Sequence, residues 1–199
     1  MNINNLVVGP IEVNCYVLTV DDKLYIIDPG GSSEKIISKV RSMNKQVECI
    51  LLTHGHIDHI SAVKAVSEAF DNIPVYLHSD DLSLYLSRDN SLPPIYPALI
   101  DPVKPINSLS ETDFKIIHTP GHSKGSVCFY FEKDGVLFSG DTLFCESIGR
   151  SDLPGGDHAT LINSIKNEIM VLDSNTIVYP GHGPKTTINN EKKYNPFLK

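Results

Sequence analysis

The sequence has few cysteines, and their wide spacing argues against a disulfide scaffold. Only four are present, at Cys15, Cys49, Cys128 and Cys145, and no two of them form a Cys-x-x-Cys pair. Three lie in apolar, strand-like runs and are expected to be small core residues, whereas Cys145 lies closer to the polar motifs described below. A reduced protein is therefore expected, rather than a disulfide scaffold.

Long apolar runs and an excess of basic charge are also missing. No run approaches the length of a membrane span, and residues 1–5 lack the basic-then-apolar profile of a secretory signal. We therefore expect a cytoplasmic protein with no membrane partner. The formal net charge is −7, which argues against nucleic acid as the main partner because phosphate backbones require basic surfaces.

The chain also has no linker, low-complexity tract or block of like charge that would mark a domain boundary. Its 199 residues are enough to bury a sizeable core. We therefore predict one domain spanning residues 1–199. The oligomeric state is left open.

The most informative stretch that is present follows a short β-prone run at residues 49–52, and it reads Thr53-His54-Gly55-His56-Ile57-Asp58-His59. In an extended segment, residues two apart point to the same side, so His54 and His56 can share one metal ion. Asp58 and His59 lie where the chain is expected to turn into a helix, and they can reach a second ion. Imidazole and carboxylate together suit zinc, iron or manganese.

Three further ligand candidates, His122, Asp141 and His182, recur in the same local setting. Each follows a short β-like run that ends in glycine. Glycine lets the backbone turn sharply at a strand end and approach a bound group closely. Because open α/β architectures bind ligands at strand ends, one edge of the sheets is the predicted site.

These motifs resemble those of the metallo-β-lactamase superfamily and, more narrowly, its small glyoxalase II-like, or hydroxyacylglutathione hydrolase-like, members. The resemblance runs nearly end to end. Besides the histidine loop it rests on Ile26-Ile27-Asp28-Pro29-Gly30, Thr119-Pro120-Gly121-His122-Ser123, Ser139-Gly140-Asp141-Thr142-Leu143-Phe144, Gly149-Arg150-Ser151-Asp152-Leu153-Pro154-Gly155-Gly156-Asp157, Pro180-Gly181-His182-Gly183-Pro184 and Asn195-Pro196-Phe197-Leu198. It implies an α/β fold of the four-layer αβ/βα sandwich type, with two mixed sheets flanked by helices.

The resemblance also implies a dinuclear metal centre. Carried over position by position, one ion is held by His54, His56 and His122, the other by Asp58, His59 and His182, and Asp141 bridges both. Two cations that share a water give a hydroxide nucleophile near neutral pH, so Asp58 and Asp141, with a metal-bridging hydroxide, are the expected catalytic groups. Two divalent ions are expected. Zinc is favoured, and iron or manganese is also compatible with a site that has no thiolate ligand.

The implied activity is hydrolysis of a small-molecule thioester, such as S-lactoylglutathione or a related hydroxyacyl thioester. One alternative is a persulfide dioxygenase-like enzyme, which works with a single iron held by two histidines and an aspartate. Asp58 and His59 supply a second metal site and so favour hydrolysis. The other alternative is a metal-binding protein without turnover, although an open, water-bearing site implies chemistry.

Four residues near the ligands have weaker assignments. Arg150 and Lys124 are candidates for contact with an anionic substrate, but Arg150 can instead pair within its own loop and Lys124 can be a solvated lysine. Asp28 and Thr53 are candidates to orient the histidine loop, with turn formation as the alternative for Asp28. The chain ends at Lys199, before the basic helical domain by which full-length glyoxalase II enzymes hold glutathione. Weak binding of glutathione thioesters is therefore expected.

Periodicity and turn signals predict the order of the elements. Strands are expected over 6–8, 14–20, 24–27 and 75–77, and helices over 33–43, 60–70, 158–171 and a short stretch from residue 80. The helix over 33–43 should begin at Ser32 or Ser33, and the helix over 158–171 should have Asp157 as its N-cap. Residues 90–110, which contain five prolines, are expected to form a long loop. That loop is either a wall of the active-site cleft or a passive crossover.

Overall fold

The computed structural model describes residues 1–110 and 112–199. The described chain divides into two compact units, Met1–Leu109 and Ser110–Lys199. Whether they act as the single domain expected from the sequence stays a prediction. Within the described residues, no helix is both long and apolar enough to cross a membrane.

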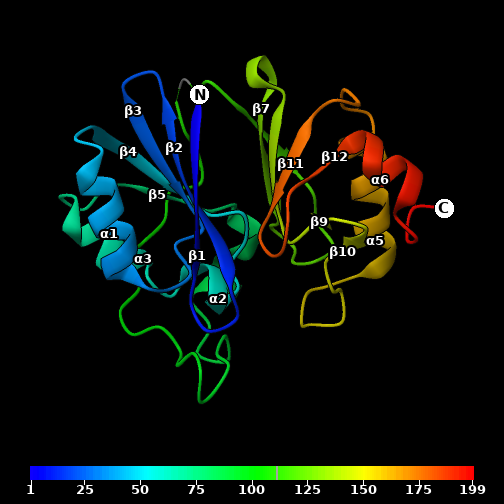
Figure 1. Cartoon of the computed structure of the whole chain (residues 1–199). Helices are drawn as coiled ribbons and strands as arrows, with labels where there is room; N and C mark the ends of the chain where they lie inside the picture. Colours follow the sequence, from blue (N-terminus) through cyan, green and yellow to red (C-terminus); the bar gives the residue numbers. More distant parts are fainter. Residues whose placement is uncertain (111) are drawn as a thin grey trace. The chain divides into compact units, whose positions relative to one another are not determined.

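The unit Met1–Leu109 is built on a five-stranded mixed sheet in the order β1-β2-β3-β4-β5 (Figure 1). The first three strands are antiparallel neighbours, and β3, β4 and β5 run parallel. The elements are β1 (Asn2–Val8), β2 (Val13–Val20), β3 (Lys23–Ile27), α1 (Ser33–Ser42), β4 (Gln46–Leu51), α2 (Ile57–Ile60), α3 (Val63–Ala69), β5 (Val75–Tyr76), the 3-10 turn η1 (Ser79–Asp81) and α4 (Leu82–Tyr85).

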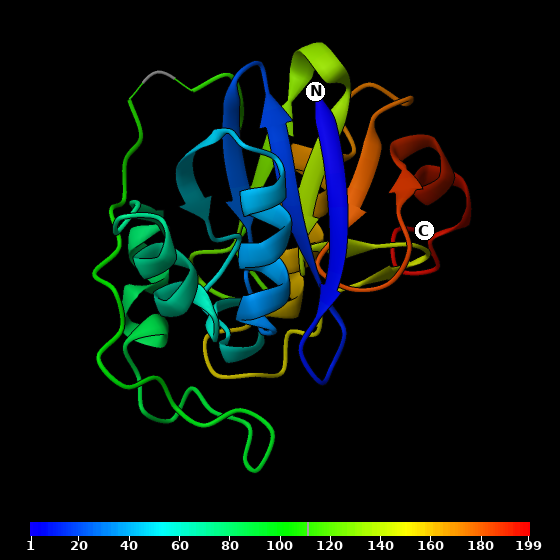
Figure 2. The ribbon, with the colours of Figure 1, turned by 60° about the vertical axis from the view of Figure 1, so that its left-hand side comes forward.

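Helices α1 and α3 contact each other and share one apolar core with the sheet, and Figure 2 shows α1 against the sheet face. Ile36 and Val40 are buried in this core, as the expected helical stripe requires. Ser32 stands at the N-cap of α1, but its hydroxyl makes no bond to the helix. It accepts instead from the backbone N–H of Gly9 at 3.3 Å, so it ties the turn between β1 and β2 to the start of α1.

The unit Ser110–Lys199 is built on a second five-stranded mixed sheet, in the order β12-β11-β8-β7-β6. Strands β8 and β11 are parallel, and the other neighbours are antiparallel. The elements are β6 (Lys115–His118), β7 (Val127–Phe131), the 3-10 turn η2 (Glu132–Asp134), β8 (Val136–Gly140), the hairpin β9 (Leu143–Phe144) and β10 (Ser147–Ile148), α5 (His158–Ser164), the π-helical turn η3 (Ile165–Ile169), β11 (Ile177–Pro180), β12 (Thr186–Thr187) and α6 (Ile188–Tyr194).

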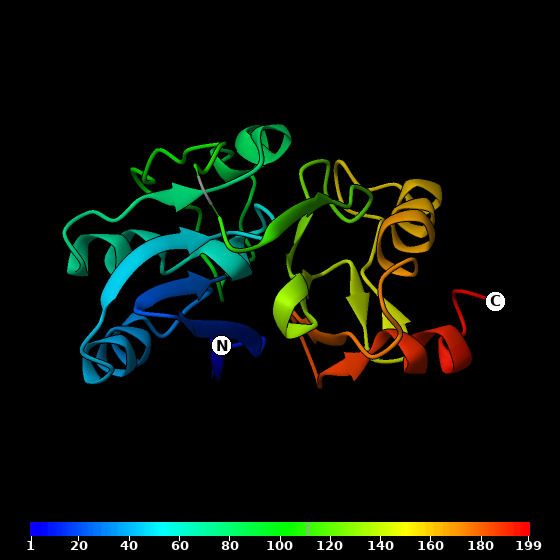
Figure 3. The same ribbon diagram turned by 90° about the horizontal axis from the view of Figure 1, so that it is seen from above.

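Helices α5 and α6 cover this second sheet, and in Figure 3 they are the gold and red helices beside it. Leu161 of α5 and Ile188 of α6 share an apolar core with Leu137 and Val178 of the sheet. Asp157 caps α5 as expected, because its carboxylate accepts from the backbone N–H of Thr160 at 2.7 Å.

Two helix predictions were wrong in extent. The helix expected over 60–70 begins earlier and is broken into α2 and α3 around Ala62, whose ψ of 2° leaves the helical region. The helix expected over 158–171 ends as an α-helix at Ser164 and continues as the π-helical turn η3. In both cases an apolar face persists while the backbone hydrogen-bond pattern changes. The spacing of apolar residues alone cannot distinguish such a segment from a continuous α-helix.

The predicted positions of the ligand candidates at strand ends are confirmed within each unit. The histidine loop follows β4, which ends at Leu51. Asp141 directly follows β8, and His182 lies two residues after β11. Since β8 and β11 are parallel and Gly181 N donates to Gly140 O at 2.8 Å, these two side chains start from the same edge of one sheet.

Candidate metal centre

In the unit Met1–Leu109, the histidine loop gathers three imidazoles. The ring centroids of His54 and His56 are 4.8 Å apart, and those of His54 and His59 are 4.2 Å apart. His54 and His59 are buried and His56 is partly exposed. One potential ligand atom from each of Asp28, His54 and His59 lies within 4.8 Å of the others. Burial of so many imidazoles is unusual unless they bind or pair.

The carboxylate of Asp28 fixes this loop. Its Oδ1 accepts from Thr53 N at 2.8 Å, and its Oδ2 accepts from Thr53 Oγ1 at 2.6 Å. Oδ2 also lies 2.9 Å from His59 Nδ1. Because a carboxylate at this distance accepts a hydrogen bond, the His59 proton is assigned to Nδ1, and Nε2 is left as the metal-binding atom. His59 Nε2 is 3.5 Å from Asp58 Oδ2.

Thr53 extends the same arrangement to His54. Its Oγ1 is 3.0 Å from His54 Nδ1, and its own proton is donated to Asp28. The hydroxyl oxygen is therefore placed to accept from His54 Nδ1–H, which again presents Nε2. The structure thus brings Asp28 and Thr53 to the histidines they were expected to orient. Their role in a metal centre stays a prediction.

Two further buried residues hold the loop backbone, and the sequence analysis missed both. Asp81 Oδ2 accepts from Gly55 N at 2.8 Å. Asn90 Oδ1 accepts from Ile57 N at 3.0 Å, and its Nδ2 donates to Gly55 O at 2.8 Å. Neither residue belongs to a recognisable motif. Their only signal is burial, which a sequence does not show directly.

In the unit Ser110–Lys199, the carboxylate of Asp141 lies close to two imidazoles. Its Oδ2 is 3.7 Å from His122 Nε2 and 3.7 Å from His182 Nε2. His122 Nδ1 is 2.7 Å from the carbonyl oxygen of Arg150, so the His122 proton belongs on Nδ1 and Nε2 is the available ligand atom. The Phe144 ring stands edge-on to His182, with centroids 6.3 Å apart.

Gly149 allows this group to assemble. A Cβ atom built on it would lie 1.8 Å from Asp141 O and 3.3 Å from His122 Nδ1. Only a residue without a side chain lets the chain after the β9–β10 hairpin pass so close to the backbone of Asp141. The close approach of these two segments therefore explains why the motif has glycine at position 149, before Arg150.

The two candidate substrate residues differ in their surroundings. The guanidinium of Arg150 donates through Nε and Nη2 to the two carboxylate oxygens of Asp152, each at 2.8 Å. This hydrogen bonding holds the pKa of Asp152 down at about 2. Arg150 therefore makes the salt bridge within its own loop that was its alternative assignment. Lys124 is exposed, and its carbonyl oxygen lies 2.9 Å from His118 Nε2. A substrate role for either residue stays a prediction.

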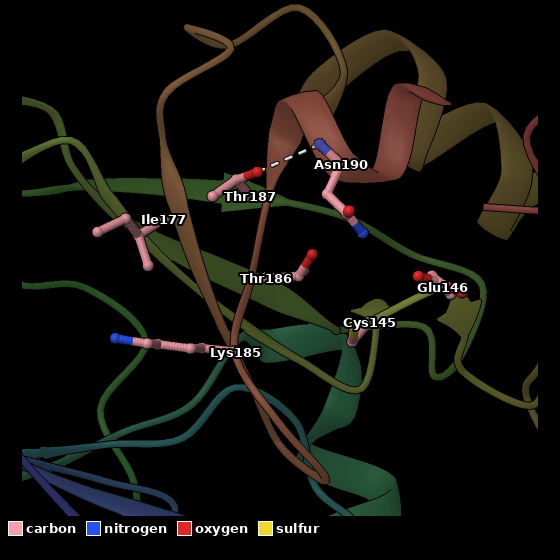
Figure 4. Close-up of a pocket in the computed structure, with 7 residues that line it drawn as sticks. All are labelled: Cys145, Glu146, Ile177, Lys185, Thr186, Thr187 and Asn190. Atoms are coloured by element: carbon pink, nitrogen blue, oxygen red, sulfur yellow. Dashed lines mark hydrogen bonds between the residues drawn. The ribbon is translucent and has the colours of Figure 1, made fainter. Parts of the chain in front are cut away.

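A separate open pocket of about 480 Å³ lies in the same unit (Figure 4). Its lining residues come from the β9–β10 turn, β11, β12 with the residue before it, and α6. They are Cys145, Glu146, Ile177, Lys185, Thr186, Thr187 and Asn190. The hydrogen bond drawn there runs from Asn190 N to Thr187 Oγ1 and caps α6. No predicted site residue is among those seven.

The donor atoms fit the metal that the sequence implies. Within each unit, imidazole Nε2 atoms stand beside a carboxylate oxygen, and Nδ1 is held by a carboxylate, hydroxyl or carbonyl oxygen for His59, His54 and His122. That arrangement of imidazole ligand and outer acceptor is typical of metal-binding histidines. A nitrogen and oxygen donor set without thiolate accepts zinc, iron or manganese.

Comparison with known proteins identifies the family. Residues 8–182 match the model of the metallo-beta-lactamase superfamily. A probable metallo-hydrolase of Streptococcus pyogenes serotype M6 is 40% identical over 197 residues, which cover 93% of this chain and 85% of the relative. The hydroxyacylglutathione hydrolase GloC of Haemophilus influenzae is 36% identical over 208 residues, covering 100% of this chain and 98% of the relative.

Two solved structures are similarly close. The BLEG-1 B3 metallo-beta-lactamase has a TM-score of 0.89 at 42% identity and covers 99% of both chains. TTHA1623 in a di-iron-bound form has a TM-score of 0.88 at 39% identity, with 98% of this chain and 100% of that chain covered. The chain belongs to the metallo-beta-lactamase superfamily, a family of metallo-hydrolases. The predicted fold class, two mixed sheets with helices, is confirmed.

Proposed function

We propose that the protein is a dinuclear metal-dependent hydrolase of small-molecule thioesters, with S-lactoylglutathione or a related hydroxyacyl thioester as substrate. The observation that carries the proposal is the presentation of Nε2 by three buried histidines, His54, His59 and His122, whose Nδ1 atoms lie against oxygen acceptors. Histidines that serve only packing do not need this shared orientation.

The proposed ligand set follows the sequence. His54, His56 and His122 take one ion, Asp58, His59 and His182 take the other, and Asp141 binds both. When bound, two such cations lower the pKa of a water towards neutrality and supply a hydroxide nucleophile. Asp58 and Asp141 would be the carboxylates that hold these cations. Zinc is the favoured metal, and a di-iron form of a 39% identical structure supports iron as an alternative.

The thioester assignment is supported by the relative named hydroxyacylglutathione hydrolase, which aligns over 98% of its own length. In the reaction, water adds to the thioester carbonyl carbon and the C–S bond breaks. The products are a hydroxy acid and a thiol. A thiolate leaves readily, so the residues need only hold the carbonyl and the water in line. Free thiols as products suit the reduced cytoplasm, where we place the protein.

A second candidate, β-lactam hydrolysis, is favoured by one observation. The BLEG-1 structure, at 42% identity, is described as a B3 metallo-beta-lactamase. The same nucleophile would attack a strained amide instead of a thioester. The difference lies in the leaving group and in how the substrate is held, so direct comparison of substrates decides between the two.

The test is a substrate panel with purified, metal-loaded protein. It includes S-lactoylglutathione, thioesters of other low-molecular-weight thiols, a cephalosporin and glutathione persulfide. We expect thioester cleavage, followed by thiol release, with the highest kcat/KM. Oxygen uptake with the persulfide and no thioester cleavage would overturn the proposal in favour of a dioxygenase. No turnover despite two bound metals would favour a metal-binding protein.

The ligand set has its own test. Asp141→Ala removes the ligand proposed to be shared by both ions, so this variant should lose nearly all activity. His59→Ala should weaken the binding of one ion only. His158→Ala, which alters an exposed histidine at the start of α5, serves as the control and should bind metal like the wild type. Elemental analysis measures the outcome. A His59→Ala protein that keeps about two metals per chain would show that His59 is not a ligand.

A further inference from the structure

The long loop after α4 carries a buried tyrosine that no motif singles out. Tyr96 and Leu92 exchange backbone hydrogen bonds, Leu92 N to Tyr96 O and Tyr96 N to Leu92 O, each at 2.8 Å. The Tyr96 side chain is only 3% exposed and belongs to the apolar core of the unit Met1–Leu109. The proline-rich loop is thus closed on itself and anchored through this ring.

The hydroxyl of Tyr96 has no hydrogen-bond partner among residues 1–110 and 112–199. The backbone N–H of Ile11 is near enough to lower the pKa of the phenol but completes no hydrogen bond. A buried tyrosine hydroxyl normally donates to an acceptor. The contrast is Tyr85, equally buried in the same core, whose hydroxyl donates to Val103 O at 2.9 Å.

Two glycines connect this hydroxyl to a proposed metal ligand. A Cβ atom built on Gly9 would lie 2.1 Å from Tyr96 Oη and 3.3 Å from Gly30 O. A Cβ atom built on Gly30 would lie 1.7 Å from the backbone oxygen of Asp58. The Tyr96 hydroxyl therefore packs onto Gly9, in the turn between β1 and β2, and the Asp58 backbone packs onto Gly30, after β3. The two glycines lie next to each other.

The electrostatics agree with this placement. Burial and, to a smaller extent, the charge of Asp58 raise the pKa of Tyr96 to about 12. At neutral pH the phenol is therefore protonated and able to donate. Asp58 supplies the negative charge beside it.

We propose that Tyr96 is a positioning residue for Asp58, whose carboxylate accepts a hydrogen bond from the Tyr96 hydroxyl when it binds metal. Carboxylates that bind metal are themselves usually hydrogen-bonded, which fixes the oxygen that faces the ion. The inference rests on the proposed metal centre and adds to it a residue outside every motif. It also gives the long loop a function, because the loop would control the ion held by Asp58.

The test compares Tyr96→Phe with Tyr85→Phe. Each change removes one hydroxyl from a buried ring of the same core, so the two variants match in size and location. Purified proteins are dialysed against a series of chelator concentrations, and bound metal is measured by elemental analysis. Thermal unfolding of the metal-free proteins checks the fold. No substrate is needed.

We expect Tyr96→Phe to release one of its two ions about 10- to 100-fold more readily than the wild type, and to hold the other unchanged. Tyr85→Phe should keep both. Combining Tyr96→Phe with Asp58→Asn should add little to the effect of Asp58→Asn alone, because both changes act on one ligand.

Three outcomes would overturn the inference. Tyr96→Phe could hold both ions as tightly as the wild type, even with lower activity, which would assign the hydroxyl to the substrate. The two tyrosine variants could bind both ions equally weakly, which would show that the Tyr96 hydroxyl only supports the fold. The effects of Tyr96→Phe and Asp58→Asn could be fully additive. By contrast, a wild-type protein that does not take up two ions would overturn the proposed function itself.

Discussion

At the residue scale, a single buried carboxylate organises the histidine loop. Asp28 accepts hydrogen bonds from both the backbone and the hydroxyl of Thr53, and it faces His59 Nδ1. Thr53 in turn faces His54 Nδ1. Two imidazoles therefore take their orientation from one side chain, through contacts that span 31 residues of sequence in the case of His59.

Asp28→Asn should disrupt this orientation with little change in volume. An amide nitrogen in place of a carboxylate oxygen would meet donors, so His59 Nδ1–H would lose its acceptor or the ring would change tautomer. We expect about a 10- to 100-fold loss of affinity for the ion at His59, measured by metal competition with a chelator. Asp22→Asn, at an exposed surface pair with Lys45, is the control. Affinity equal to that of the wild type would show that Asp28 only forms the turn.

The cysteines give a second prediction. Cys15, Cys49 and Cys128 are buried, as expected, and Cys145 is intermediate. Burial raises the pKa of Cys49 to about 12 and that of Cys128 to about 11. Since the thiolate is the reactive form, a thiol reagent at pH 8 should label only Cys145 quickly in the folded protein. The other three should react after denaturation. Fast labelling that persists in Cys145→Ser would contradict this assignment.

At the scale of elements, the sequence predicted the strand ends, which depend on local residue patterns. It missed the helix breaks and the contacts between distant segments. The strand ends that carry Asp141 and His182 follow from short β-prone runs ending in glycine, and both are confirmed. The break at Ala62 and the π-helical turn after Ser164 were missed, because an apolar stripe survives both. Asp81 acts on Gly55 across 26 residues, a contact that no local pattern encodes.

The turn before His122 gives a prediction at this scale. Gly121 has a φ of +130°, and a Cβ atom built on it would lie 2.2 Å from Leu161 N in α5. Gly135 also has a positive φ, +64°, but nothing lies within 4 Å of its Cβ position. Gly135→Ala should therefore cost about 1–3 kcal/mol from backbone strain alone. Gly121→Ala should cost clearly more, since helix α5 must move.

Urea unfolding of the two glycine variants measures the difference. Gly135→Ala serves as the control, because it places a side chain at a positive φ without a clash. Equal destabilisation of the two proteins would show that the contact between the turn and α5 contributes nothing beyond backbone conformation.

Helix α6 contains a buried carboxylate with a different function. Glu191 is 0% exposed. Its Oε1 accepts from Thr186 Oγ1 at 2.5 Å and from Asn190 Nδ2 at 3.0 Å. Its Oε2 accepts from Glu146 N at 2.9 Å and from Asn195 Nδ2 at 2.8 Å. All four partners are donors, so both carboxylate oxygens act as acceptors. The side chain fastens the β9–β10 turn to β12 and α6.

Glu191→Gln should weaken this connection, because the amide nitrogen would face donors. We expect a loss of about 1–3 kcal/mol in the free energy of unfolding, measured by urea denaturation. Glu132→Gln is the control. Glu132 forms an exposed pair with Lys115 at 2.8 Å, and removing it should change stability by no more than about 1 kcal/mol. A Glu191→Gln protein as stable as the wild type would show that water or a shifted side chain replaces the lost acceptor.

At the scale of the whole molecule, the proposed ligands are divided between the two compact units. The histidine loop belongs to Met1–Leu109, while His122, Asp141 and His182 belong to Ser110–Lys199. The sequence could name all of them because each belongs to a short motif. It could not show how the chain supports the histidine loop, since Asp81 and Asn90 act through contacts between segments far apart in sequence.

Under the proposed ligand set, bound metal should stabilise the entire chain. Metal that binds only the folded protein adds RT ln(1 + [L]/Kd), about 4 kcal/mol when the free metal is 1,000 times Kd. Removing the ions with a chelator should therefore lower the unfolding midpoint, and adding zinc, iron or manganese should restore it. Because Asp141 is the proposed ligand of both ions, Asp141→Ala should lose most of this stabilisation, whereas His158→Ala should keep it. Calorimetry of metal-free and metal-loaded protein measures the shift. Superimposable unfolding curves for the two forms of the wild type would show that metal does not bind the folded protein in preference to the unfolded chain, and would contradict the proposed metal centre.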